Sequence, residues 1–242
     1  MIDSLVILGD SLFGSRVSVD DAVADAERLG IDGIVAAPAR GRDYVLPAAN
    51  TRLAEEAAAQ PAVRRLVRVD PNQGQAAVAE LHRGIDELGC IGVFLNPDEE
   101  VFRIQDAEPV VRVAAERGLP VVIAAGVPLR SEPLQILELA QRVPRSQLVL
   151  TSGGQINISG LSMVDAWAAL EQAPNLAVLS NGEYRQDFLE RIVRDLGAER
   201  LLFASFAPYY EQAFEVTRIR SARFSVIERD LVMEGNARRL FG

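Results

Sequence analysis

The sequence predicts an α/β protein whose strands and helices form a closed (β/α)8 TIM barrel. Short apolar runs alternate with amphipathic segments along the whole chain, as in proteins built from β–α units around a parallel sheet. Eight such units with short connections fit into 242 residues, which favours a closed barrel over an open, doubly wound sheet. No linker or low-complexity segment separates them, so we expect residues 1–242 to form a single domain.

Each expected element follows from a local pattern. The strands are short runs of branched and apolar residues: SLVIL (4–8), GIVAA (33–37), RLVRV (65–69), IGVFL (91–95), PVVIA (120–124), LVLT (148–151), LAVLS (176–180) and LLFAS (201–205). Between them, apolar residues recur at helical spacing. The expected helices lie near 19–29, 48–60, 75–89, 107–117, 132–142, 162–173, 186–196 and 210–221, and an extra helix near 225–240 closes the chain.

Several helix ends are marked by residues suited to them. Ser18 and Asp21 resemble a capping box, and Pro109 and Pro133 fit the first turns of their helices. Glycines stand where helices are expected to end, at positions 30, 89, 118 and 197.

Composition narrows the function. The net charge is −9 and the pI is near 4.8, which argues against nucleic acid as a partner. No segment approaches the ~20 apolar residues that a membrane span needs, and the acidic start of the chain is unlike a signal peptide. We therefore expect a cytoplasmic protein with neither membrane nor nucleic-acid partners. The single cysteine, Cys90, lies in an apolar run and is expected to be a buried filler.

Two further counts restrict the chemistry. All 25 basic residues are arginine, so Schiff-base catalysis by a lysine is excluded. The only histidine, His82, lies beside the apolar stripe of an expected helix and is interpreted as a surface or edge residue.

In a barrel of this kind, functional residues follow the carboxyl ends of the strands. Asp10 and Glu183 are the candidate catalytic residues, because a carboxylate in a dry pocket can act as an acid or base. Each has a structural alternative: Asp10 as a hydrogen-bonding loop residue and Glu183 as an acid at a helix start. Asp70, which precedes a proline, is interpreted as a turn residue.

The candidate ligand-binding residues occupy the same loops. Arg40, Arg42 and Tyr44 form a cluster that could clamp a carboxylate or phosphate, or pair with acidic residues in a solvated loop. Ser152 opens a Ser-Gly-Gly segment that could offer backbone N–H groups to an anion, or could simply form a tight turn. The other polar candidates are Asn96, Asn181 and Tyr184.

Several stretches resemble the amidohydrolase superfamily, in the branch related to small-molecule lactonases and decarboxylases. The resemblance runs in order through VRVDPNQGQAAVAELHRGIDELGCIGVFLNP (67–97), GLPVVIAAG (118–126), VPRSQLVLTSGG (143–154), APNLAVLSNG (173–182), GAERLLFASFAP (197–208) and EGNARRLFG (234–242). It implies the barrel fold, a small-molecule ligand at the mouth of the barrel, and is consistent with a homodimer.

The resemblance also implies that the metal ligands of the family are lost. Its first strand carries an aspartate and a His-x-His pair, where this chain has Asp3, Leu5 and Ile7. The histidines of strands five and six correspond to Ala124 and to Thr151 or Ser152. The strand-eight aspartate corresponds to Phe206. Because Leu, Ile, Ala and Phe have no lone pairs for a metal, we expect no metal and no cofactor.

With Leu5, Ile7 and Ala124, Phe206 is expected to make the barrel floor apolar, and so to contact the ligand. The leading hypothesis is a metal-independent enzyme acting on a small cyclic or aromatic carboxylate or lactone, by hydrolysis, isomerisation or related cofactor-free chemistry. The alternative is a catalytically inactive homologue that serves as a binding or scaffold protein. The enzyme hypothesis predicts a pocket containing a carboxylate, and the alternative predicts a filled mouth.

Overall fold

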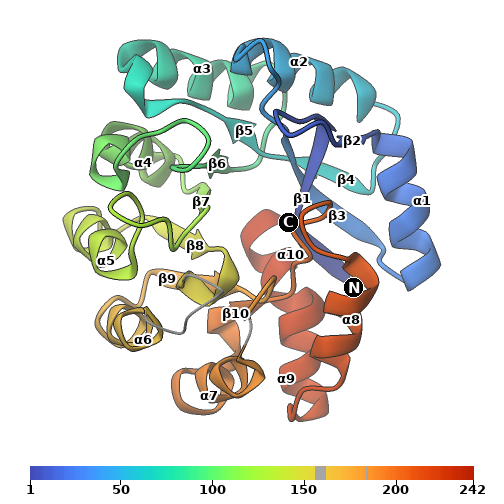
Figure 1. The fold of residues 1–242 in the computed structure, drawn as a ribbon, viewed down its shortest axis with the longest axis vertical. Coiled ribbons are helices and arrows are strands. Elements are labelled where there is room, and N and C mark those ends of the chain that lie inside the picture. Colours follow the sequence, from blue (N-terminus) through green and yellow to red (C-terminus); the bar gives the residue numbers. More distant parts are fainter. Residues whose placement is uncertain (156–161, 184) are drawn as a thin grey trace.

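The computed structural model describes residues 1–155, 162–183 and 185–242. Figure 1 shows a ring of strands enclosed by helices, which confirms the predicted (β/α)8 barrel. The parallel barrel strands are β1 (Ile2–Asp10), β3 (Gly33–Pro38), β4 (Val63–Arg65), β5 (Val67–Arg68), β6 (Val93–Leu95), β7 (Pro120–Ile123), β8 (Gln147–Leu150), β9 (Leu176–Leu179) and β10 (Leu201–Leu202).

The third predicted strand is divided into β4 and β5. β4 pairs with β3 on one side, whereas β5 pairs with β6 on the other. Leu66 lies between the two, and its N–H still donates to the carbonyl of Ala36 at 2.8 Å. The change of partner therefore divides one predicted strand into two without opening the barrel wall.

The wall closes between β1 and the segment after β10. The N–H of Ser4 donates to Phe203 O at 3.0 Å, and the N–H of Ile7 donates to Ala207 O at 2.8 Å. In the opposite direction, the N–H of Phe206 donates to Leu5 O at 2.9 Å. These bonds satisfy the backbone groups of strands that would otherwise be exposed edges.

Helices cover the outside of the barrel at the predicted places. They are α1 (Val19–Leu29), α2 (Leu46–Glu56), α3 (Gln75–Asp86), α4 (Glu108–Glu116), α5 (Pro133–Arg142), α6 (Met163–Gln172), α7 (Gln186–Leu196) and α8 (Gln212–Arg220). The extra helical segment at the chain end comprises α9 (Val226–Asp230), a π-helical turn (Leu231–Gly235) and α10 (Asn236–Phe241). The Ser18 cap is confirmed, because its side chain accepts from the N–H of Asp21.

Alternation along the strands builds two apolar layers. On β1, Leu5 and Ile7 belong to the cluster inside the barrel, whereas Val6 and Leu8 belong to the larger cluster between strands and helices. Cys90 is buried in the outer layer, and burial raises the pKa of its thiol to about 11. This supports its interpretation as a core residue.

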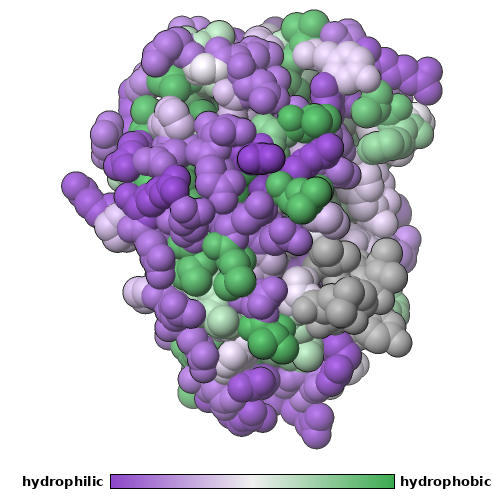
Figure 2. Space-filling view, turned by 60° about the vertical axis from the view of Figure 1, so that its left-hand side comes forward, coloured by the Kyte–Doolittle hydropathy of each residue, from purple (hydrophilic) through white to green (hydrophobic). Residues whose placement is uncertain are grey.

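The surface is mostly polar. Figure 2 shows hydrophilic side chains over much of one face, with hydrophobic ones in small groups between them. Within residues 1–155, 162–183 and 185–242, no helix combines the length and the apolar character needed to cross a bilayer.

Candidate functional site at the mouth of the barrel

A pocket of about 270 Å³ lies at the carboxyl ends of the strands. The loops after β1, β6, β7, β8 and β10 all contribute side chains to it. Its described lining residues are Phe13, Asn96, Asp98, Glu99, Ala124, Ala125, Gly126, Val127, Thr151, Ser152, Gln155, Phe206, Tyr209 and Tyr210. A pocket at this end of the barrel is where an enzyme of this architecture places its reacting groups.

The barrel interior next to this pocket is apolar. Leu5, Ile7 and Ala124 belong to the buried cluster inside the barrel, and Phe206 packs against that cluster. Of these four residues, Ala124 and Phe206 also line the pocket. The ring of Phe206 meets that of Phe94 edge-on, with centroids 6.4 Å apart. Its centroid is 4.9 Å from that of Tyr209, so aromatic rings pack around one side of the mouth.

Phe206 reaches this position through an unusual backbone conformation. Its φ of 58° lies in the left-handed region, which is costly for a residue with a side chain. Strained backbone of this kind is concentrated at functional sites in proteins. Ser152, in the segment after β8, also has a positive φ of 52°. The two residues belong to the lining of the same pocket.

A charged cluster lies beside the pocket and was not predicted. Arg68, on β5, is fully buried. Its Nη2 donates to Glu99 Oε2 and to Glu100 Oε1, at 2.7 Å in each case, and its Nη1 donates to Pro38 O at 3.1 Å. Its guanidinium carbon lies 5.4 Å from the ring centroid of Phe94. One buried cation thus holds two carboxylates that follow β6.

The pKa values of Glu100 and Arg68 are both raised in this cluster. Burial raises the pKa of Glu100 to about 7, although the attraction of Arg68 opposes the rise. Burial alone would lower the pKa of Arg68. The charges of Glu100 and Glu99 together raise it by more, so the net change is upward. Oε2 of Glu100 is buried without a hydrogen-bond partner among the described residues. A proton on Glu100 therefore has a place that leaves its bond to Arg68 intact.

Glu99 connects this cluster to the pocket. It is one of the lining residues, and its Oε1 accepts from the hydroxyl of Tyr209 at 2.8 Å. Burial is the main cause that raises the pKa of Tyr209, and the nearby Glu99 adds to it. Glu99 consequently bridges a buried arginine on one side and a pocket-lining phenol on the other.

The two carboxylates predicted to be catalytic lie elsewhere. The Asp10 side chain is 71% exposed and lies 3.4 Å from Nε of Arg16, so it lacks the dry surroundings on which its prediction depends. Glu183 is buried, and burial raises its pKa to about 7. It accepts from Gln155 Nε2 and from the N–H of Arg185. Gln155 lines the pocket, and Glu183 lies behind it.

One member of the predicted arginine cluster, Arg40, faces the buried charges. Nε of Arg40 lies 3.9 Å from Oε1 of Glu100, and its guanidinium carbon stacks 4.1 Å above the ring centroid of Tyr44. Arg42 is exposed near Gly14. None of the three is among the described residues that line the pocket.

The amide and hydroxyl candidates are closer to the mouth. Asn96 and Ser152 line the pocket. Asn96 Oδ1 accepts from the N–H groups of Asp98 and Glu99, which holds the loop after β6 in place. Asn181 is fully buried and bonds both the N–H and the hydroxyl of Ser152, at 3.3 Å each. Tyr184 lies outside the described residues.

A pattern in the sequence points to the residues that were missed. In RLVRV, Leu66 and Arg68 have the same parity along the strand, so both point into the barrel. A charge at such a position needs a buried partner, and three consecutive acids, Asp98, Glu99 and Glu100, follow the next strand. Strand alternation could thus have identified Arg68, and Tyr209 belongs by position to the polar residues that follow the last predicted strand. Neither pattern predicts which of the three acids pairs with Arg68, nor the contact between Tyr209 and Glu99.

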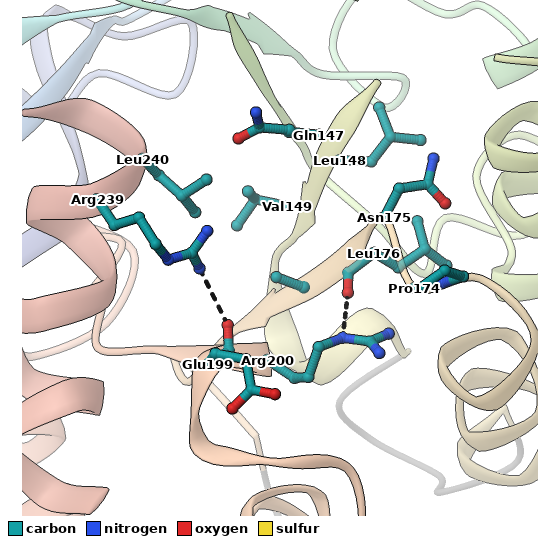
Figure 3. A pocket seen from close by; sticks show the side chains of 11 residues that line it. Gln147, Leu148, Val149, Pro174, Asn175, Leu176, Glu199, Arg200, Arg239 and Leu240 are labelled. Atoms are coloured by element: carbon teal, nitrogen blue, oxygen red, sulfur yellow. Dashed lines mark hydrogen bonds between the residues drawn. The ribbon is translucent and has the colours of Figure 1, made fainter. Parts of the chain in front are cut away.

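A larger pocket, of about 410 Å³, lies at the opposite end of the barrel near the amino ends of β8 and β9. Figure 3 shows Arg200 bonded to Leu176 O and Arg239 bonded to Glu199 O in this pocket. Arg200 also donates to the carbonyls of Leu170 and Ala173, at 2.9 Å each. These bonds tie the end of α6 to β9, and this end of such barrels serves stability rather than catalysis.

The residues inside the barrel do not fit a catalytic metal ion. A catalytic metal needs about three ligands with lone pairs. The interior positions on β1 hold Leu5 and Ile7, and the segments that follow β7 and β10 hold Ala124 and Phe206. Among the residues that the structure describes, no three or more His, Cys, Asp or Glu are grouped for a metal ion. Asp3 accepts instead from the N–H of Ser205 and from Gln212 Nε2, at 2.8 Å each.

Several solved structures are similar to this chain over almost its entire length. A 2,6-dihydroxybenzoate decarboxylase from Rhizobium has a TM-score of 0.77 at 17% identity, covering 100% of this chain and 99% of that one. A 5-carboxyvanillate decarboxylase from Sphingomonas paucimobilis has a TM-score of 0.76 at 18% identity, covering 100% and 98%. A dihydroxybenzoic acid decarboxylase from Polaromonas sp. JS666, with bound manganese and an inhibitor, has a TM-score of 0.76 at 17% identity, covering 99% and 96%.

At these identities the structural likeness establishes the fold alone. No protein with a curated description matches the chain significantly. The sequence model of one family, described as amidohydrolase, matches residues 8–242, which is nearly the whole chain and agrees with the resemblance seen in its strands. The chain therefore belongs to the amidohydrolase family.

Proposed function

We propose that this protein binds and converts a small cyclic or aromatic carboxylate or lactone at the mouth of its barrel, without a metal ion. The observation that carries the proposal is the pocket of about 270 Å³, which combines an apolar floor, aromatic walls and the carboxylate of Glu99. A concave site with few polar groups and a charged residue is typical of small-molecule enzymes.

The names of the structural relatives support the ligand class. Those relatives are decarboxylases of dihydroxybenzoates and of 5-carboxyvanillate, which are single aromatic rings. A single ring matches a pocket of this size and can stack against Phe206 and Tyr209. One relative holds manganese, but the interior of this barrel offers apolar side chains at the corresponding strands. We therefore assign the reaction to acid–base side chains.

Ligand binding and metal content test the proposal together. Protein purified without chelators is expected to hold well below one Zn, Mn or Fe per chain by elemental analysis. It is expected to bind 2,6-dihydroxybenzoate or the aryl lactone dihydrocoumarin in calorimetric titrations, and Ala124→Trp, which fills the floor, is expected to abolish binding. A stoichiometric metal would contradict metal independence, and failure of ring lactones and ring carboxylates alike to bind would contradict the ligand class.

A non-catalytic binding protein is the second candidate. The packing of Phe206 against Phe94 and Tyr209 favours it, because aromatic rings occupy part of the mouth. This candidate predicts saturable binding of a ring compound with no turnover of any ligand that binds. Product analysis by mass spectrometry after prolonged incubation distinguishes it from the enzyme.

A further inference from the structure

The side chains of Tyr209, Glu99, Arg68 and Glu100 form one continuous chain of hydrogen bonds beside the pocket. Its links are Tyr209 to Glu99 at 2.8 Å, and Arg68 to Glu99 and to Glu100 at 2.7 Å each. Two of its members, Glu99 and Tyr209, line the pocket. Arg68 is fully buried and Glu100 nearly so. The chain therefore runs from the ligand space to the interior.

We propose that Glu99 is the general base of this site, that Tyr209 orients it, and that the substrate is an uncharged cyclic ester. Arg68 and Glu100 are positioning residues that act through Glu99. This inference rests on the proposed function and selects the lactone from the ligand classes given there.

The charge of the pocket wall selects an uncharged substrate. Asp98 and Glu99 are both lining residues, and no arginine is among the described residues of the lining. Arg130 lies 3.5 Å from Asp98, and Arg68 faces Glu99 from behind the wall. A free carboxylate entering the pocket would meet like charge, whereas a neutral lactone meets aromatic rings and hydrogen-bonding groups.

Glu99 has the lone pairs that a base needs. Each of its carboxylate oxygens accepts one bond, from Tyr209 or from Arg68, and has a further lone pair for a water molecule. Glu99 takes a proton from water as the water oxygen bonds to the lactone carbonyl carbon, and the carbonyl π electrons move to its oxygen. When the carbonyl re-forms, the ring C–O bond breaks and the ring oxygen takes the proton from Glu99. The product is the hydroxy acid, and water is the only co-reactant.

Arg68 and Glu100 hold Glu99 in place. Nη2 of Arg68 bonds both carboxylates at 2.7 Å, so Glu99 and Glu100 share one donor. Arg40, 3.9 Å from Glu100, is the other cation that faces the pair. Removing the Glu100 carboxylate should leave Arg68 bonded to Glu99 without a competing anion, and so change the position and the basicity of Glu99 without touching the ligand.

Hydrolysis of dihydrocoumarin, followed by absorbance across pH 4–9, tests the inference. Glu99→Gln is expected to lower kcat by about 100-fold or more, and Tyr209→Phe by about tenfold. Glu100→Gln is expected to lower kcat by about threefold to tenfold with KM unchanged, because it acts on Glu99 and makes no contact with the ligand. Glu138→Gln, a distant and exposed substitution on α5, is the matched control and should leave rate and profile unchanged. Circular dichroism checks that each variant is folded.

The outcomes separate this inference from the proposed function. If the wild type hydrolyses the lactone and folded Glu99→Gln does so within twofold, the base assignment is wrong and the proposed function stands. If the protein converts 2,6-dihydroxybenzoate but not the lactone, the substrate selection is wrong. A kcat unchanged in folded Glu100→Gln overturns its positioning role. If no ring lactone or ring carboxylate binds at all, both proposals fall.

Discussion

Nη2 of Arg68 lies 2.7 Å from Oε1 of Glu100, and water reaches almost none of either side chain. The same nitrogen also holds Glu99 at 2.7 Å. Arg68 thus faces two carboxylates at once, and Arg40, 3.9 Å from Glu100, is too far away to donate a hydrogen bond to it. Because burial disfavours the ionised form of Glu100, the stability of the fold should depend on the pH at which Glu100 loses its proton.

The first prediction concerns the pH dependence of folding. Burial raises the pKa of Glu100 from an ordinary value of 4.5 to about 7, so the folded chain binds more protons than the unfolded chain between these values. Stability therefore falls as pH rises through this window, and the loss is complete above about pH 7. We expect Glu100→Gln to remove about 2 kcal/mol of this loss. Urea unfolding of both proteins at pH 5 and pH 8 measures the difference.

Glu183 sets the background for that measurement. Burial raises its pKa to about 7 as well, so the variant should keep part of the wild-type slope. Identical slopes in wild type and Glu100→Gln would contradict the prediction. A variant that is flatter than the wild type and more stable at pH 8 would support it.

The second prediction concerns the cation itself. Arg68→Met preserves much of the side-chain volume but leaves Glu99 and Glu100 buried together without the guanidinium to which both are bonded. Removing one partner of a buried ion pair costs about 3–5 kcal/mol, so we expect a loss of that size at pH 8. The loss should be smaller at pH 5, where the carboxyl groups can be protonated. A double variant with Glu100→Gln should recover part of it, and a loss below about 1 kcal/mol at pH 8 would contradict this account.

The third prediction contrasts two aspartates of β1. Asp3 is fully buried and accepts from Ser205 N and Gln212 Nε2 at 2.8 Å each, so Asp3→Asn turns an acceptor into a donor that faces other donors. We expect a loss of about 2–3 kcal/mol. Asp10→Asn, at the exposed end of the same strand, should stay within about 0.5 kcal/mol. Thermal and urea unfolding compare the two, and equal effects would refute the contrast.

The Asp10→Asn variant also tests the prediction made for this residue from the sequence. Its exposed side chain lies beside Arg16, so we expect turnover of any identified substrate to remain within twofold of the wild type. A large loss of activity in a folded variant would restore Asp10 as the catalytic residue.

Strand periodicity and helix caps were sufficient to predict the barrel, because each of its units has its own apolar pattern. The site was harder to predict, because its residues are joined across loops. Asp10 was placed by its position after a predicted strand. However, the two-residue strand β2 (Arg16–Val17) pairs with Gly9 and Asp10, so that β1 extends as far as Asp10. Two residues are too few for any periodic pattern to predict.

The contact of Tyr209 with Glu99 is a second feature that the sequence could not predict. Its hydroxyl meets Glu99 across 110 positions of sequence, in a loop whose shape depends on the left-handed Phe206 three residues earlier. Neither the contact nor the conformation leaves a local pattern. Arg68 is the opposite case, since its place among inward-facing residues could be inferred from alternation alone.

The fourth prediction uses a glycine at which local propensity and packing disagree. Gly84 lies inside α3, where alanine would favour the helix by about 1 kcal/mol. A Cβ at this position would lie 2.5 Å from Cγ2 and 2.6 Å from Cβ of Val67 on β5. We expect packing to win, so that Gly84→Ala lowers the free energy of unfolding by about 1–3 kcal/mol. Val67→Ala opens the space that the new methyl group needs. In a double-mutant cycle, the two substitutions together should therefore cost at least about 1 kcal/mol less than the sum of their separate effects. A Gly84→Ala variant more stable than the wild type would show instead that the helix can move away from β5, in which case the strand that carries Arg68 is held less rigidly than its contacts imply.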